Sequence, residues 1–120
     1  MIKIAKEKLD GKKNVYFIEN DLLDFFDEYK ISDVDTIIST YAIHHLTQTE
    51  KHQLFEKVYS FLPKNGKIIF GDLMFKNKDY EHDMRKKYPD LVNDFDDEFY
   101  WYIEDEVKKL KKIGFKIEIK

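Results

Sequence analysis

Asp35-Thr-Ile-Ile-Ser-Thr-Tyr41 carries the clearest strand signal in this chain of 120 residues. The run is β-branched and apolar on both faces, as a buried parallel strand requires. Thr47 or Thr49 then suits the N-cap of a helix, and Glu50 lies three residues after Thr47, as in a capping box. The pattern predicts a strand over residues 35–41 and a helix that runs to about Leu62.

Segments on both sides continue this alternation. We expect helices over residues 1–9, 22–29, 78–87 and 94–113, and strands over 15–18, 67–75 and 115–119, with the later half of 67–75 turning into loop. Pro63-Lys-Asn-Gly66 predicts a turn. This order is typical of an α/β fold, with one domain over residues 1–120 and three to four mostly parallel strands flanked by helices.

The composition narrows the class of protein. Hydrophobic residues make up 42% of the chain and charged residues 38%, as in a soluble globular protein, and no apolar run approaches the roughly 20 residues that cross a bilayer. The net charge of −3 argues against a nucleic-acid partner. The chain has no cysteine, which excludes disulfides and thiolate metal sites. We expect a cytoplasmic protein that binds neither nucleic acid nor membranes.

Two longer segments carry a family resemblance. Asp35-Thr-Ile-Ile-Ser-Thr-Tyr-Ala-Ile-His-His-Leu46 resembles the strand-and-loop signature of class I S-adenosylmethionine-dependent methyltransferases, and Leu62-Pro-Lys-Asn-Gly-Lys-Ile-Ile-Phe-Gly-Asp72 resembles the next landmark of that family. The series is most similar to the small bacterial YrrT-like methyltransferases and extends to the Gly114-Phe115 turn. The resemblance implies a Rossmann-like sheet and S-adenosylmethionine as the cofactor.

One family feature has no counterpart here. Family members begin with a strand, a Gly-rich loop of GxGxG type, a helix and a second strand that ends in an acidic residue. None of the four glycines, Gly11, Gly66, Gly71 and Gly114, forms such a loop. Residues 1–9 instead resemble the helix after that second strand. The resemblance therefore implies a partial domain, the C-terminal two-thirds of the family domain, and we expect it to be marginally stable, oligomeric or rearranged.

The resemblance also implies cofactor-binding residues. Asp21 would accept a hydrogen bond from the adenine amino group, and Leu22 would offer its backbone N–H and an apolar surface. The alternative for Asp21 is an N-cap of the helix that begins at Leu22. Ser39, Thr40 and Tyr41 would line the methionine part of the cofactor, or reflect only the β-propensity of the strand.

Histidines form the sharpest local feature. The resemblance places His45 beside the cofactor pocket, where an imidazole can act as a base or hydrogen-bond donor. The alternative is a loop histidine packed against the sheet. No residue is assigned a direct catalytic role. The four histidines, His44, His45, His52 and His82, lack the spacing of a metal site.

Three further features are candidates, and two of them have two interpretations each. Asp72 either faces the substrate or simply ends its strand. The acidic run over residues 94–98 suits a solvated helix start. The aromatic run over residues 99–102 belongs either to a substrate lid or to core packing.

Two functions remain open. The first is transfer of a methyl group from S-adenosylmethionine to a small-molecule acceptor. The second is an inactive, truncated relative that acts only by protein association, including with a second copy, through an exposed sheet edge. Another α/β fold, such as a nucleotide-binding dehydrogenase, lacks a Gly-rich fingerprint of its own.

Overall fold

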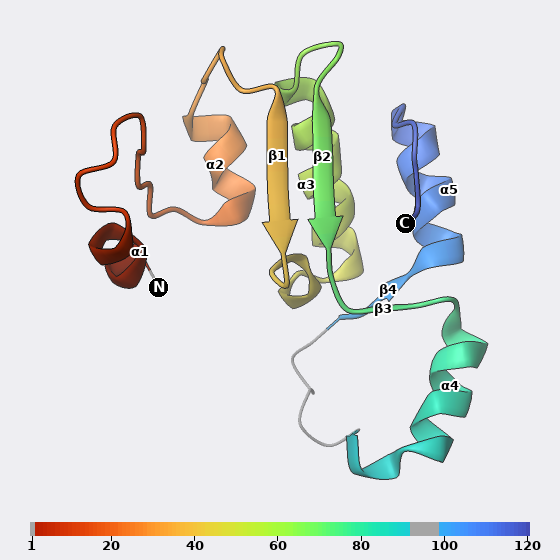
Figure 1. Ribbon diagram of the computed structural model, residues 1–120. Helices are drawn as coiled ribbons and strands as arrows, with labels where there is room; N and C mark the ends of the chain where they lie inside the picture. The colour runs from red at the N-terminus through yellow and green to blue at the C-terminus, as the bar shows by residue number, and fades with distance from the viewer. Residues whose placement is uncertain (1, 92–98) are drawn as a thin grey trace.

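A parallel pair of strands forms the centre of the molecule. The computed structural model describes residues 2–91 and 99–120. Strand β1 (Thr36–Thr40) pairs with β2 (Lys67–Gly71) in a register that runs from Thr36↔Lys67 to Thr40↔Gly71. Helix α3 (Gln48–Phe61) connects them and covers one face of the pair (Figure 1). The predicted α/β class, with parallel strands and flanking helices, is confirmed.

Local chemistry explains where α3 begins and ends. Thr47 Oγ1 accepts a hydrogen bond from Glu50 N at 3.2 Å, and Glu50 Oε1 accepts one from Thr47 N at 3.0 Å, so the predicted capping box is present. Leu62 is the C-cap, and Pro63 follows it. A Cβ at Gly66 would lie 2.9 Å from Leu62 Cβ, so the tight turn into β2 requires glycine there.

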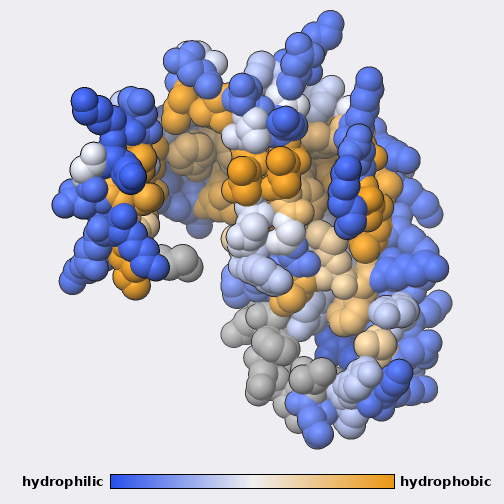
Figure 2. All heavy atoms as spheres, in the orientation of Figure 1, coloured by the Kyte–Doolittle hydropathy of each residue, from blue (hydrophilic) through white to orange (hydrophobic). Residues whose placement is uncertain are grey.

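The hydrophobic core lies between α3, the sheet and the C-terminal helix α5 (Ile103–Ile113). Its buried members among the described residues are Ile43, Leu54, Phe55, Val58, Trp101 and Leu110. The opposite face of the sheet is open: Ile38 is 71% exposed and its register partner Ile69 is 54% exposed. Figure 2 shows the apolar patch over the middle of β1 and β2.

A second, smaller strand pair follows the first. Strands β3 (Met74–Phe75) and β4 (Trp101–Tyr102) pair in parallel, with Met74 opposite Trp101. Between them lie α4 (Lys78–Lys87), with the predicted bounds, and the short 3-10 helix η2 (Pro89–Leu91). Asn77 caps α4 by accepting a hydrogen bond from Tyr80 N at 2.9 Å.

The helix predicted over residues 94–113 begins only at Ile103. Residues 94–98 lie outside the described part of the chain, and Trp101 and Tyr102 form β4 instead of helix. Trp101 N–H donates to the carbonyl of Leu73 at 3.1 Å, and the indole is buried against Phe55 and Phe70. Tertiary packing and the strand partner therefore override the helical pattern before Ile103.

Two further predicted strands are wrong. Residues 15–18 and 115–119 are in neither strand nor helix, since no other strand of the described residues pairs with them. Phe115 and Ile117 pack against the core without joining a ladder. The predicted strand over 67–75 is interrupted between Gly71 and Met74, so only its first half belongs to the central pair.

The N-terminal part extends away from the sheet. Helix α1 (Ile2–Lys8) and helix α2 (Leu22–Glu28) form where they are predicted, but α1 buries no residue (Figure 1). The radius of gyration is 16.6 Å, whereas a compact chain of this length has roughly 14 Å. Within the described residues, no helix combines the length and apolar character needed to cross a membrane.

Candidate functional site

The carboxyl end of β1 carries three of the residues singled out in the sequence. Ser39 is half-buried, and Thr40 and Tyr41 are exposed. Tyr41 N–H donates to the carbonyl of Gly71 at 2.9 Å, which extends the β1–β2 ladder by one bond. Tyr41 has a φ of 50°, a left-handed conformation that is uncommon for a non-glycine residue and is concentrated at turns and functional sites.

Asp21 and Leu22 lie at the start of α2. Asp21 Oδ1 accepts a hydrogen bond from Leu23 N at 2.8 Å, so the N-cap interpretation of Asp21 is confirmed as local geometry. Its other carboxylate oxygen makes no hydrogen bond with the described residues and remains able to accept one. Leu22 is exposed beside it.

The residues at the start of α2 and those at the end of β1 lie toward the same edge of the central strand pair. The start of α2 and the carboxyl end of β1 lie toward the same end of the central pair (Figure 1). No hydrogen bond among the described residues joins Asp21 to the segment Ser39, Thr40, Tyr41. The structure therefore brings these residues to one edge, which is where open α/β sheets bind ligands.

His45 lies on the turn that follows β1. This turn contains the 3-10 helix η1 (Ile43–His45), and His45 is exposed while His44 is buried. The two imidazole rings are 4.1 Å apart between centroids and are tilted by 41°. The exposed ring of His45 therefore packs against the buried ring of His44.

Beneath this turn lies a buried polar pair that the sequence did not identify as a pair. His44 Nδ1 lies 2.6 Å from Asp72 Oδ1, and His44 N–H donates to Asp72 Oδ2 at 2.9 Å. Asp72 directly follows β2, and His44 lies in the turn that follows β1. Because parallel strands place their carboxyl ends side by side, the signal that could have found the pair was the register of β1 on β2.

Two more charged side chains are buried behind the turn. Lys51 on α3 is completely buried, and its ammonium donates to the carbonyl of Phe99. Burial lowers the pKa of Lys51 to about 8, while the nearby Glu106 and Asp72 act in the opposite direction. Glu106 is itself buried on α5 and accepts a hydrogen bond from Lys109 at 3.2 Å.

Within the aromatic run, Trp101 packs in the core, whereas Phe99 is exposed. Trp101 is buried, and Lys51 Nζ lies 5.1 Å from its ring centroid. Gln48 Nε2 donates to the carbonyl of Tyr100 at 2.8 Å, and Phe99 N donates to the carbonyl of His44 at 2.7 Å. These bonds attach the segment before α5 to the turn that carries His45.

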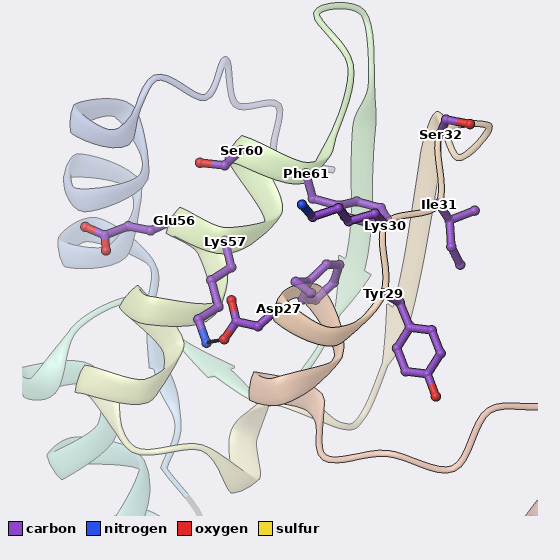
Figure 3. A pocket seen from close by; sticks show the side chains of 10 residues that line it. Asp27, Tyr29, Lys30, Ile31, Ser32, Glu56, Lys57, Ser60 and Phe61 are labelled. Atoms are coloured by element: carbon purple, nitrogen blue, oxygen red, sulfur yellow. Dashed lines mark hydrogen bonds and ion pairs between the residues drawn. The ribbon is translucent and has the colours of Figure 1, made fainter.

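One pocket lies away from these residues. A depression of about 590 Å³ lies between the last turns of α2 and α3, and the ion pair of Asp27 and Lys57, 2.6 Å long, borders it (Figure 3). Residues 29–32 and Phe61, which line it, precede β1 or end α3. The pocket is therefore at the amino-terminal edge, opposite the candidate residues. Over residues 2–91 and 99–120, no three His, Asp or Glu side chains gather as a metal site would require.

Comparisons with known proteins identify the family of the chain. A family model described as a methyltransferase domain matches residues 1–70. A protein of Oceanobacillus iheyensis, named as an uncharacterized methyltransferase, is 32% identical over 125 residues, which cover 100% of this chain and 56% of the relative. A Bacillus cereus protein of the same description is 41% identical over 102 residues, which cover 81% of this chain and 46% of the relative.

A Bacillus anthracis protein, also named as an uncharacterized methyltransferase, is 41% identical over 102 residues. The chain spans about half the length of the curated relatives it matches. Since the family model matches more than half of its residues and these relatives match most of it, the chain belongs to the class I S-adenosylmethionine-dependent methyltransferases.

Proposed function

We propose that this chain provides part of the cofactor site of a YrrT-like enzyme that transfers a methyl group from S-adenosylmethionine to a small-molecule acceptor. The observation that carries the proposal is the shared edge of the sheet. Asp21 caps α2 and Leu22 begins it toward this edge, where β1 also ends with Ser39 and Thr40 and is followed by Tyr41. The family membership supplies the reaction class.

The residues at this edge fit the proposed donor. Asp21 uses Oδ1 for the helix cap and keeps a second carboxylate oxygen for the adenine amino group. The exposed Leu22 offers an apolar surface to the ring, and the backbone of Ser39, Thr40 and Tyr41 offers polar groups to the methionine part. S-adenosylmethionine, when bound, supplies an electrophilic methyl group on its sulfonium.

Methyl transfer requires no covalent intermediate with the protein. Alignment of donor and acceptor provides most of the rate enhancement, because a bound pair no longer loses translational freedom on reaching the transition state. His45 is exposed at the same edge and can accept a proton from the acceptor or hold it by a hydrogen bond. We assign His45 this role beside the cofactor and no role in a covalent step.

Calorimetric titration of the chain with S-adenosylhomocysteine tests the proposal. We expect micromolar binding, and about tenfold weaker binding for Asp21→Asn, because asparagine preserves the N-cap but removes the charged acceptor. Asp24→Asn, on the same helix turn, is the matched control and leaves the affinity unchanged. If the wild-type chain shows no binding up to millimolar ligand and self-associates in sedimentation, the alternative is favoured, a protein that acts only by association.

A further inference from the structure

The carboxylate of Asp72 is the most deeply buried acid near the candidate site. Its side chain is 1% exposed, and that of His44 is 6% exposed. Neither residue has a part in the proposed binding of the cofactor. A carboxylate held away from water costs free energy unless several donors surround it, so its placement needs an explanation.

Two of the three groups around the Asp72 carboxylate belong to His44, and the third is the backbone N–H of Leu73. Oδ1 lies 2.6 Å from His44 Nδ1 and accepts a hydrogen bond from Leu73 N at 2.8 Å, while Oδ2 accepts from His44 N at 2.9 Å. With the carboxylate ionised, the ring nitrogen of His44 is the donor. One side chain thus holds both the backbone and the ring of His44, from a position 28 residues away in the sequence.

The turn is also held from its other sides. Tyr41 N–H donates to Gly71 O at 2.9 Å, Phe99 N–H donates to His44 O at 2.7 Å, and Leu46 N–H donates to Ile43 O at 3.0 Å. These bonds fix the backbone on both sides of the His44 ring.

The exposed residues of the turn depend on this support. The ring of His45 packs on that of His44, with centroids 4.1 Å apart. Tyr41, with its φ of 50°, projects from the first position of the turn and is 69% exposed. Without the buried pair, the loop after β1 would have to order itself each time a ligand binds, which reduces affinity.

We propose that Asp72 and His44 are positioning residues: they hold the imidazole of His45 and the backbone at Tyr41 in the arrangement that the cofactor and the acceptor meet. This inference rests on the proposed function, since that function gives His45 and Tyr41 their roles. The positioning pair touches neither ligand and acts through the turn.

The first test is made without ligand. Nitrogen-15 relaxation on the full chain measures the order of residues 41–46, with an order parameter near 0.85 expected for the wild type and a value below about 0.6 for Asp72→Asn. Glu106→Gln is the matched control, because Glu106 is also buried and accepts a hydrogen bond from Lys109 on its own helix. A purely structural carboxylate would lower stability without loosening this turn.

The second test is the affinity for S-adenosylhomocysteine. Asp72→Asn is expected to bind about tenfold more weakly, since a charge-assisted hydrogen bond is lost from the supporting turn, and Glu106→Gln to bind as the wild type does. If Asp72→Asn does not fold, His44→Asn takes its place, because an asparagine amide can still donate to Asp72 while the ring beneath His45 is gone; it should loosen His45 alone.

The outcomes separate the two proposals. Wild-type chain that does not bind S-adenosylhomocysteine, together with a turn loosened by Asp72→Asn, overturns the proposed function and supports the positioning of the turn. An equally ordered turn in Asp72→Asn, or equal loosening in Glu106→Gln, overturns the positioning role whatever the ligand does.

Discussion

Lys51 shows how a single residue sets the response of this protein to pH. Its ammonium has no exposed surface, donates to the carbonyl of Phe99 and lies over the ring of Trp101. Burial lowers its pKa from 10.5 to about 8. Tyr102 behaves in the opposite sense, because burial and its hydrogen bond to Glu81 raise its pKa from 10.0 to about 12.

The free energy of unfolding is therefore expected to rise with pH between about 8 and 10. In that window the unfolded chain keeps a proton on Lys51 that the folded chain has lost, and stability increases wherever the unfolded state binds more protons. Above pH 10 the sign reverses, since the folded chain retains the proton of Tyr102 until about pH 12.

Urea denaturation at several pH values measures this effect. Lys51→Met should remove the rise between pH 8 and 10 and leave the decline above pH 10. Lys108→Met, on an exposed position of α5, is the control that keeps the wild-type profile. If the free energy of unfolding of Lys51→Met still rises between pH 8 and 10, a group other than Lys51 causes the rise.

At the candidate site, the sequence predicted where residues lie in the fold better than which residues contact one another. The shared edge of Tyr41 and Asp72 followed from the order of strands, because parallel strands end at the same side. Asp21 lies toward this edge as the N-cap of α2, although the strand predicted before it does not form. The pair of His44 and Asp72 did not follow, since it joins residues that are 28 positions apart and its geometry depends on the strand register. The burial of Lys51 was not predictable either, because a helical sequence pattern does not distinguish a buried lysine from an exposed one.

Among the elements, helix ends are the best-determined features. Thr47 caps α3 and Asn77 caps α4 through their own side chains, which are local interactions that a sequence reveals. Strand formation at residues 15–18 and 115–119 was not predictable in this way. A strand exists only if a neighbouring backbone supplies its hydrogen bonds, and alternation of apolar residues does not say whether one does.

The end of α5 offers a test at this scale. Gly114 has a φ of 129°, and a Cβ built there would lie 2.6 Å from the hydroxyl of Tyr59. Gly114→Ala should therefore lower the free energy of unfolding by about 1–2 kcal/mol, mostly from backbone strain, because the exposed Tyr59 ring can move aside. Thermal and urea denaturation followed by circular dichroism measure the change.

Gly71 provides the matched control for that substitution. It ends β2, its φ is negative, and a Cβ there would meet no atom within 4 Å. Gly71→Ala is expected to change stability by less than about 0.5 kcal/mol. Equal losses in both variants would show that backbone conformation at Gly114 is not the cause.

The molecule as a whole leaves much of its central sheet uncovered. Helix α3 protects one face, while Ile38 and Ile69 are exposed side by side on the other (Figure 2). The radius of gyration of 16.6 Å reflects the same open arrangement. An exposed apolar surface of this kind promotes association and binding of hydrophobic dyes.

We expect the dilute chain to bind anilinonaphthalene sulfonate, to unfold over a broad temperature range and to associate as its concentration rises. Replacing Ile38 and Ile69 together by lysine should reduce dye fluorescence at least twofold and shift sedimentation toward the monomer, because the apolar patch is removed. Tyr16→Lys, which changes an exposed residue away from the sheet, is the control. A sharp, reversible transition of a dye-free monomer would contradict this expectation.

The placement of Asp72 after the second strand also has a consequence for synthesis of the chain. As translation proceeds, β1 and the histidine turn leave the ribosome first, and the carboxylate that anchors them emerges only after the whole of α3. Bringing the ends of so long a connection together costs entropy and delays the non-local pairing. The nascent turn is therefore unanchored for that interval, when cellular chaperones and proteases have access to it.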